Sequence, residues 1–439
     1  MRHRFPLIAS LVCVAVSVVY LLPQILFQQP NILDVAETWA FGQDVVGNGI
    51  AELSNTQRFR PLYVFERTFM NALFSYRPPL YFLFFSLLLS ITMYTGYLIL
   101  KKDGRDTMVY GFIGFLFLIS PVTVDTFWRL GTAENLFALA LIASLYTLLR
   151  QQYTLLIFWL FMLMGSKETA VFVIPIFITA LWFKKRYWEA ALVTVGYLAF
   201  ALKIYSLIRY THENIGSYTA LFSVIPGSVG DMFVYYTTSY VFYVALFLFA
   251  CAHVLYRKRF HKRSGVSGYF EWEYFYIILI LSNLISLLFF RNKFQPYYFF
   301  PVLSVLLLIV GHELHLATPV VKRVFVLYTC ILFIVIGTFQ QTWERVRFWQ
   351  REYAGDGALF AYMKKEASTR KFSFVYAYRP EISSVLEIWY HIHPQPADTE
   401  NTAIIELRDP SQQSSGSPLC GRTFFGESSC KWQIVIDSR

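Results

Sequence analysis

Long hydrophobic runs recur along the whole chain and are separated by short polar links. Each of the longer runs could cross roughly 30 Å of hydrocarbon as a helix, and together the runs predict about eleven transmembrane helices. We expect them near residues 6–27, 79–100, 108–122, 134–149, 153–165, 169–183, 188–208, 233–256, 272–290, 296–313 and 323–339. No Ala-x-Ala-like cleavage site follows the first run, so it is expected to remain as the first helix.

Basic residues cluster in alternate links between these runs. They are Arg2 and Arg4; Lys101, Lys102 and Arg105; Lys184, Lys185 and Arg186; Arg257, Lys258, Arg259, Lys262 and Arg263; and Lys322 and Arg323. This positive-inside pattern places Met1 and these links in the cytoplasm. An odd number of helices then places residues 340–439 outside.

Composition agrees with a membrane protein. Of the 439 residues, 56% are hydrophobic and 15% are charged, which leaves too little polar surface for a soluble protein of this length. The net charge of +10 lies in the links and reports topology, so membrane lipids are expected partners and nucleic acid is not. The first outer loop, 28–78, contains two amphipathic stretches, 33–52 and 60–75, which we expect to lie along the membrane surface.

The chain becomes polar after Phe339. Residues 341–367 have a helical pattern, and three segments alternate like strands, at 371–378, 402–408 and 431–437. The Ser/Gln/Gly-rich segment 409–419 is predicted to be a loop. We therefore expect a transmembrane domain over 1–340 and a small extracytoplasmic α/β domain over 341–439, in which Cys420 and Cys430 could form a disulfide.

Ionisable residues from five separate stretches fall at the outer edge of the predicted bundle. They are Asp34, Arg58, Arg60, Asp125, Arg129, Glu134, Lys167, Glu168 and Arg291. Charges in or beside transmembrane helices are costly and usually mark function. Their common level predicts a polar cavity that faces outward.

The first and last of these stretches suggest catalysis and phosphate binding. Asp34 could act as a general base or could be an acid at a helix N-terminus. The guanidinium groups of Arg58 and Arg60 suit a phosphate or sugar hydroxyls, or lipid headgroups. Arg291 precedes an aromatic segment that includes Tyr297, where a cation could stabilise a leaving phosphate; an interfacial aromatic belt is the alternative.

The middle stretches contain acids and bases at close spacing. Asp125 and Arg129 are four residues apart, so they would pair on a helical turn, and Glu134 follows a short way on. The alternative to a functional role is a structural ion pair that stabilises a tight turn. The sequence Gly165-Ser166-Lys167-Glu168 joins two apolar helices through a very short link; it could be only a turn, although a Lys–Glu pair at the membrane edge is expensive to keep.

Taken in order, these pieces resemble the GT-C superfamily of membrane glycosyltransferases. The resemblance covers about residues 1–340. It rests on Asp34, Arg60-Pro61-Leu62, NALFSYRPPLYFLFFSLLLS (71–90), Pro121…Asp125…Arg129…Ala133-Glu134, Ser166-Lys167-Glu168 and Arg291…Pro296-Tyr297-Tyr298…Pro301. It is similar to the branch of transmembrane-and-TPR O-mannosyltransferases and bacterial relatives of the protein O-mannosyltransferases. The departures are that no TPR repeats follow, and that Phe82, Ser86 and Ser90 replace the usual His and Asn of the second helix.

The resemblance implies an all-α polytopic bundle that transfers sugar from a polyprenyl-phosphate carrier to an acceptor hydroxyl, usually with inversion. Asp34 would be the base, and the basic groups would hold the lipid phosphate. A bacterial inner membrane location fits best, with a glycan, lipid or protein as acceptor. The residues leave open a lipid-linked-sugar transporter or flippase and an inactive GT-C-like partner subunit. No spacing predicts a metal site; a divalent cation is not firmly implied.

Overall fold

The computed structural model describes residues 4–26, 43–54, 59–74, 77–103, 106–130, 132–214, 240–260, 272–288, 296–369, 372–375, 403–408, 417–422, 425 and 427–437. The helices are α1 (Arg4–Leu26), α3 (Val45–Ser54), α4 (Pro61–Phe74), α5 (Pro78–Asp103), α6 (Thr107–Leu118), α7 (Pro121–Phe127), α8 (Glu134–Leu149), α9 (Tyr153–Ser166), α10 (Ala170–Phe183), α11 (Tyr187–Asn214), α13 (Val241–Phe260), α14 (Trp272–Leu288), η3 (Pro296–Phe299), α15 (Phe300–Leu316), α16 (Pro319–Val335) and α17 (Thr338–Thr369).

Where the structure describes them, the apolar runs predicted from the sequence are mainly helical. Within the described residues, four segments are long and apolar enough to cross a membrane, namely α1, α5, α11 and η3 with α15; two bent pairs, α6 with α7 and α16 with α17, bring the number to six. Five shorter apolar helices, α8, α9, α10, α13 and α14, lie among them. These helices identify an integral membrane protein, while the count of about eleven crossings stays a prediction.

The predicted span 108–122 is wrong in one respect, because the helix breaks near its end. Proline lacks an amide hydrogen and clashes inside a helix, but it is favoured at a first helical position. Pro121 begins the separate helix α7, which is bent by 64° from α6. The Ser120 hydroxyl caps α7 by accepting a hydrogen bond from the Val122 amide at 3.2 Å. The break carries Asp125 away from the direction of α6.

A second bend joins the bundle to the C-terminal part. The predicted span 323–339 is divided between α16 and α17, which meet at 56°. Gly337 lies between them with φ of 72°, a left-handed conformation that glycine adopts readily after a helix end. The predicted helix 341–367 is confirmed, and α17 also crosses the expected domain boundary at residue 340.

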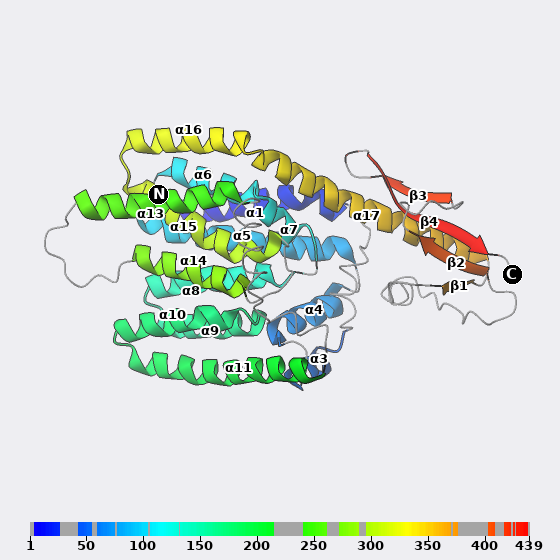
Figure 1. The fold of residues 1–439 in the computed structure, drawn as a ribbon, viewed down its shortest axis with the longest axis horizontal. Coiled ribbons are helices and arrows are strands. Elements are labelled where there is room, and N and C mark those ends of the chain that lie inside the picture. Colours follow the sequence, from blue (N-terminus) through cyan, green and yellow to red (C-terminus); the bar gives the residue numbers. More distant parts are fainter. Residues whose placement is uncertain are drawn as a thin grey trace.

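α15 forms the centre of the bundle and is buried along nearly its whole length. It contacts α5, α6, α8, α13 and α14, whereas α1, α11 and α16 expose many large apolar side chains. Figure 1 shows α3, α4 and α7 at the end of the bundle from which α17 departs, with the N-terminal end of α1 toward the other end.

The amphipathic stretch 60–75 forms α4 over Pro61–Phe74, and its polar face is covered by protein. Glu66, Arg67 and Asn71 are buried against the protein, while Phe65 and Phe69 are exposed. The polar face therefore belongs to the interior. Of the other stretch, 33–52, the residues before 43 lie outside the described part.

Four described strands form a mixed sheet at the C-terminal end of α17. They are β1 (Phe372–Val375), β2 (Ala403–Arg408), β3 (Ser417–Arg422) and β4 (Ser428–Asp437), in the order β1-β2-β4-β3. The predicted strands 402–408 and 431–437 are confirmed within the described residues, and so is 371–378 over Phe372–Val375; the predicted loop 409–419 is wrong at its end, where β3 begins. Antiparallel pairing places Cys420 opposite Cys430, and the two form a disulfide.

Candidate functional site

Several charged side chains are buried together at the end of the bundle from which α17 departs. Asp125 is 0% exposed and Lys167 is 5% exposed, and Glu134, Glu168 and Arg129 are also buried. Burying a charge is costly unless another group compensates it. The partners of these residues therefore define the site.

Glu134 and Lys167 form a buried ion pair between Oε1 and Nζ. Glu134 is the first residue of α8, where the helix dipole favours an acid. Lys167 caps α9 with extended backbone angles, φ −160° and ψ 145°. Its Nζ also lies 4.2 Å from the centre of the Tyr298 ring. One cation thus joins α8, the α9–α10 link and η3.

Lys167 and Glu168 have different partners. Neighbouring side chains on an extended backbone point to opposite sides, and Glu168 instead accepts a hydrogen bond from the Phe59 amide at 3.4 Å. A Cβ atom on Gly165 would lie 3.2 Å from the Leu62 Cβ, so glycine permits this close approach. The 60–62 and 165–168 motifs are therefore neighbours.

Arg129 lies between aromatic rings. Its Cζ is 5.0 Å from the ring centre of Tyr297 and 5.8 Å from that of Trp349, both within cation–π range. Tyr297 and Tyr298 are adjacent on η3 and lie beside Arg129 and Lys167 respectively. This short 3-10 helix therefore places an aromatic face against two buried cations.

Asp125 and Arg129 do not have the i, i+4 helical geometry expected for an ion pair, although Arg129 still interacts electrostatically with Asp125. α7 ends at Phe127 with Trp128 as its C-cap, so Arg129 lies outside the helix and the i, i+4 geometry is lost. Asp125 Oδ1 instead accepts a hydrogen bond from Trp349 Nε1 at 2.9 Å. Its Oδ2 lies 3.8 Å from Arg345 Nη1. The partners come from α17.

Sequence reasoning missed the contribution of α17. Arg345 and Trp349 are four residues apart and so share one helical face, a spacing that is visible in the sequence. Gln350 Nε2 donates to Gln24 Oε1 at 3.0 Å, and Gln24 Nε2 donates to the Trp128 carbonyl at 2.8 Å. α17 is thus fixed to both α1 and the segment that carries Arg129.

α4 brings a second buried group that the sequence did not reveal. Arg67 is fully buried; its Nη2 donates to the Thr132 carbonyl at 3.0 Å, and its Nε is 3.2 Å from Glu66 Oε2. Burial raises the pKa of Glu66 to about 7, although Arg67 opposes the shift. The Arg60 guanidinium lies 4.6 Å from the centre of the Tyr63 ring. The backbone amide of Arg60 donates a hydrogen bond to Glu52 Oε1 at 2.6 Å.

Three predicted site residues, Asp34, Arg58 and Arg291, lie outside the described residues. Of the others, Glu134, Lys167, Arg129, Tyr297 and Asp125 are brought to one end of the bundle. Side chains with metal-ligand spacing lie elsewhere, near the opposite end of α15, where Glu273, His312 and Glu313 meet.

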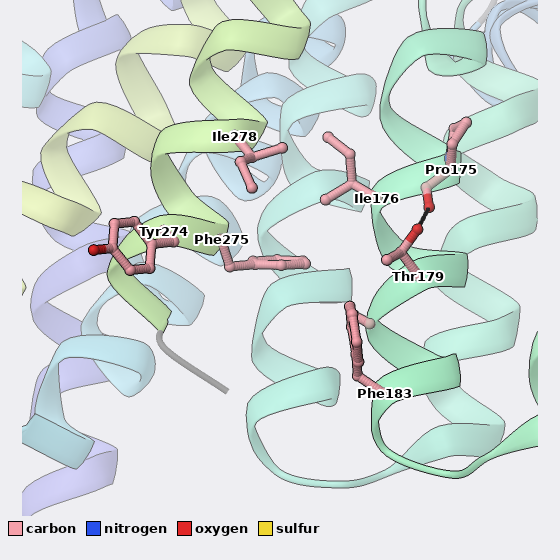
Figure 2. Close-up of a pocket in the computed structure, with 8 residues that line it drawn as sticks. Pro175, Ile176, Thr179, Phe183, Tyr274, Phe275 and Ile278 are labelled. Carbon is pink, nitrogen blue, oxygen red and sulfur yellow. Dashed lines mark hydrogen bonds between the residues drawn. The ribbon is translucent and has the colours of Figure 1, made fainter. Parts of the chain in front are cut away.

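Among the described helices, apolar cavities occur at two places of interest. The larger, of about 530 Å³, is bounded by α1, α5, α6, α8 and α15. An added Cβ on Gly111 or Gly114 of α6, both in its lining, would meet no atom within 4 Å. The smaller, of about 390 Å³, lies between α10 and α14. Figure 2 shows its apolar lining, with the Thr179 hydroxyl bonded to the Pro175 carbonyl at 2.8 Å.

No protein-family model and no curated protein matches the sequence. The fold is similar to that of ArnT from Cupriavidus metallidurans bound to undecaprenyl phosphate, with a TM-score of 0.54 and 12% sequence identity over 97% of each chain. At this identity the likeness shows the fold alone. It supports the mainly helical membrane bundle expected from the sequence, while the GT-C superfamily and its O-mannosyltransferase branch stay predictions.

Proposed function

We propose that this protein is a membrane glycosyltransferase that moves a sugar from a polyprenyl-phosphate carrier to an acceptor hydroxyl. The observation that carries the proposal is the pair of buried cations, Arg129 and Lys167, held against Tyr297 and Tyr298 at one end of the bundle. The similar fold of ArnT was solved with undecaprenyl phosphate bound, a ligand with the anionic head and apolar chain that this arrangement suits.

The cations have a direct role in the proposed reaction. The acceptor oxygen attacks the anomeric carbon, the bond from that carbon to the phosphate oxygen breaks, and polyprenyl phosphate leaves with the bonding electrons. Negative charge grows on the phosphate, and Arg129 and Lys167 stabilise it. An ammonium group has three N–H donors, so Lys167 can hold Glu134 and a phosphate oxygen together.

Asp34 is the proposed base, by the GT-C resemblance. It takes the proton from the acceptor hydroxyl as the new glycosidic bond forms. Attack from the face opposite the phosphate inverts the anomeric carbon. Arg58, Arg60 and Arg291 are proposed to help hold the phosphate or sugar.

The polyprenyl chain is proposed to occupy the larger apolar cavity. Its lining includes Ser304 and Leu307 of α15, whereas Tyr298 lies on η3 just before that helix. Six residues of helix span about 9 Å, so the cavity begins a short distance below the phosphate position. Such a placement leaves the head group among the cations and the chain among apolar side chains.

The proposed orientation puts the site outside the cytoplasm, in a bacterial inner membrane. Two observations support it: the basic links alternate as the positive-inside rule requires, and the sheet at the end of α17 contains the Cys420–Cys430 disulfide, which is typical of oxidising compartments. The sheet would then lie on the acceptor side.

The test is sugar transfer by purified protein in proteoliposomes. A panel of polyprenyl-phosphate monosaccharides, each labelled in the sugar, is mixed with envelope extract as acceptor. We expect one donor to lose its label to a product, and Asp34→Asn to abolish the transfer while binding undecaprenyl phosphate normally. Movement of labelled lipid between leaflets without transfer would favour a flippase and contradict the proposal.

A further inference from the structure

The ends of three helices bring two histidines and two glutamates together far from the proposed active site. His253 lies in the second half of α13, Glu273 in the first turn of α14, and His312 and Glu313 near the end of α15. Tyr298 lies before the start of α15, so this cluster is roughly 20 Å along the helix from it. Sequence spacing does not reveal the cluster because three helices contribute to it.

The distances separate two kinds of contact. His253 Nδ1 lies 2.7 Å from Glu313 Oε2, a hydrogen bond. His312 Nε2 lies 3.6 Å from Glu273 Oε1, which is longer than a hydrogen bond. One possible ligand atom from each of Glu273, His312 and Glu313 lies within 4.8 Å of the other two.

These distances approach those of a metal site. In tetrahedral zinc sites the bonds to nitrogen and oxygen are about 2.0–2.2 Å, which places neighbouring ligand atoms about 3.3–3.5 Å apart. The distance between His312 Nε2 and Glu273 Oε1 is close to this value. Small side-chain movements would bring a carboxylate oxygen of Glu313 to the same distance from both.

The burial and charge of these side chains also favour a bound metal ion. The Glu313 side chain is 0% exposed and that of Glu273 is 12% exposed, so two carboxylates are close together in a region with little water. A divalent cation could bind both carboxylates at this separation. Imidazole nitrogen combined with carboxylate oxygen suits zinc and its first-row neighbours.

We propose that Glu273, His312 and Glu313 bind a divalent transition-metal ion, with Zn²⁺ the best-suited ion, and that His253 positions Glu313. A histidine hydrogen-bonded to a ligating carboxylate is a frequent outer partner in metal sites. With Oε2 of Glu313 held by His253, Oε1 would be the oxygen that binds the ion. The ion would tie α14 to α15 and, through His253, to α13.

The test measures zinc binding by the full chain, purified without a polyhistidine tag and stripped with a chelator. Metal content is measured after Zn²⁺ loading and dialysis, and affinity by titration against a competing chelator. We expect one zinc ion per chain in the wild type, with loss of that ion in Glu273→Gln and in His312→Ala. His253→Gln should keep the stoichiometry but bind zinc about 10- to 100-fold more weakly.

His315→Ala is the matched control. His315 lies on the same helix, but its ring is 5.2 Å from the Tyr110 ring of α6, and we expect this variant to bind one zinc ion with wild-type affinity. The proposal is overturned if the wild type retains no zinc, if both ligand variants keep it, or if His315→Ala loses it to the same extent. Each readout is independent of sugar transfer.

Discussion

Lys167 and Glu134 form a buried ion pair although they are 33 residues apart in the chain. Removing one partner of such a pair leaves an uncompensated charge, at a cost of about 3–5 kcal/mol. The proposed reaction also needs the Lys167 cation, since it stabilises the leaving phosphate. Stability and catalysis therefore depend on this pair in different ways.

A double-mutant cycle separates the two roles. Glu134→Gln and Lys167→Met should each lower the thermal unfolding midpoint in detergent, and the double variant should recover part of that loss because neither charge remains. Sugar transfer should fall on the order of 100-fold or more in Lys167→Met and should not recover in the double variant. Recovery of transfer there would contradict a phosphate-binding role for Lys167.

Trp349 should hold α17 to the candidate site through its indole N–H. Trp349→Phe keeps an aromatic ring for Arg129 but leaves Asp125 Oδ1 without its donor, and we expect a loss of about 1–3 kcal/mol in unfolding free energy. The control is Trp343→Phe, whose ring contacts Phe425, 5.1 Å away between centres. Equal losses in the two variants would contradict the role of the Asp125 hydrogen bond.

The larger cavity should bind the polyprenyl chain. Gly114→Leu places a side chain where an added Cβ meets no atom within 4 Å, so the protein should fold and the KM for the donor should rise several-fold, with a smaller change in kcat. Ala180→Leu fills part of the α10–α14 cavity shown in Figure 2 and is the matched control. Equal effects of both substitutions on KM would place the chain elsewhere.

Stability should fall as pH rises through the range in which Glu66 ionises. Its pKa is raised from 4.5 to about 7 in the folded protein. Between those pH values the unfolded chain binds fewer protons than the folded protein, so the free energy of unfolding decreases as pH rises. This pKa shift corresponds to a loss of about 3 kcal/mol in the free energy of unfolding. The loss is absent below pH 4.5 and complete above pH 7. Unfolding midpoints from pH 4 to 8 should show this fall in wild type.

Glu66→Gln should flatten that dependence and stabilise the protein at pH 8, because the amide carries no charge to bury. Glu344→Gln, at an exposed position on α17, serves as the control and should leave the slope unchanged. A wild-type slope that survives in Glu66→Gln would assign the titration to another group.

The hydrophobic pattern was sufficient to predict most helices, because apolar runs must be buried in protein or lipid wherever their neighbours lie. Side-chain partners were not predictable in the same way. Lys167 and Asp125 each have a plausible partner nearby in the sequence, but the extended backbone at Lys167 and the early end of α7 direct both elsewhere. Their observed partners, Glu134 and Trp349, are set by helix packing, which local spacing does not specify.

The inward polar face of α4 illustrates the same limit. Phe65 and Phe69 are four residues apart and are interleaved with the polar residues Glu66 and Arg67. This pattern predicts an amphipathic helix, and the helix is present. Which face of α4 packs against the protein depends on whether water or lipid surrounds the helix. In a membrane the apolar face can contact lipid while the buried charges meet the bundle. The hydrophobic pattern alone does not reveal that protein covers the polar face.

Photolabelling tests most directly whether the lipid phosphate binds at Lys167 and Arg129. An undecaprenyl phosphate analogue with a photoreactive group beside the phosphate is bound to the protein in nanodiscs, irradiated, and mapped by peptide sequencing. We predict labels within 129–134, 165–169 and 297–298, all lost when excess undecaprenyl phosphate competes. Competed labels only at the other end of the bundle, around Glu273 and His312, would contradict it.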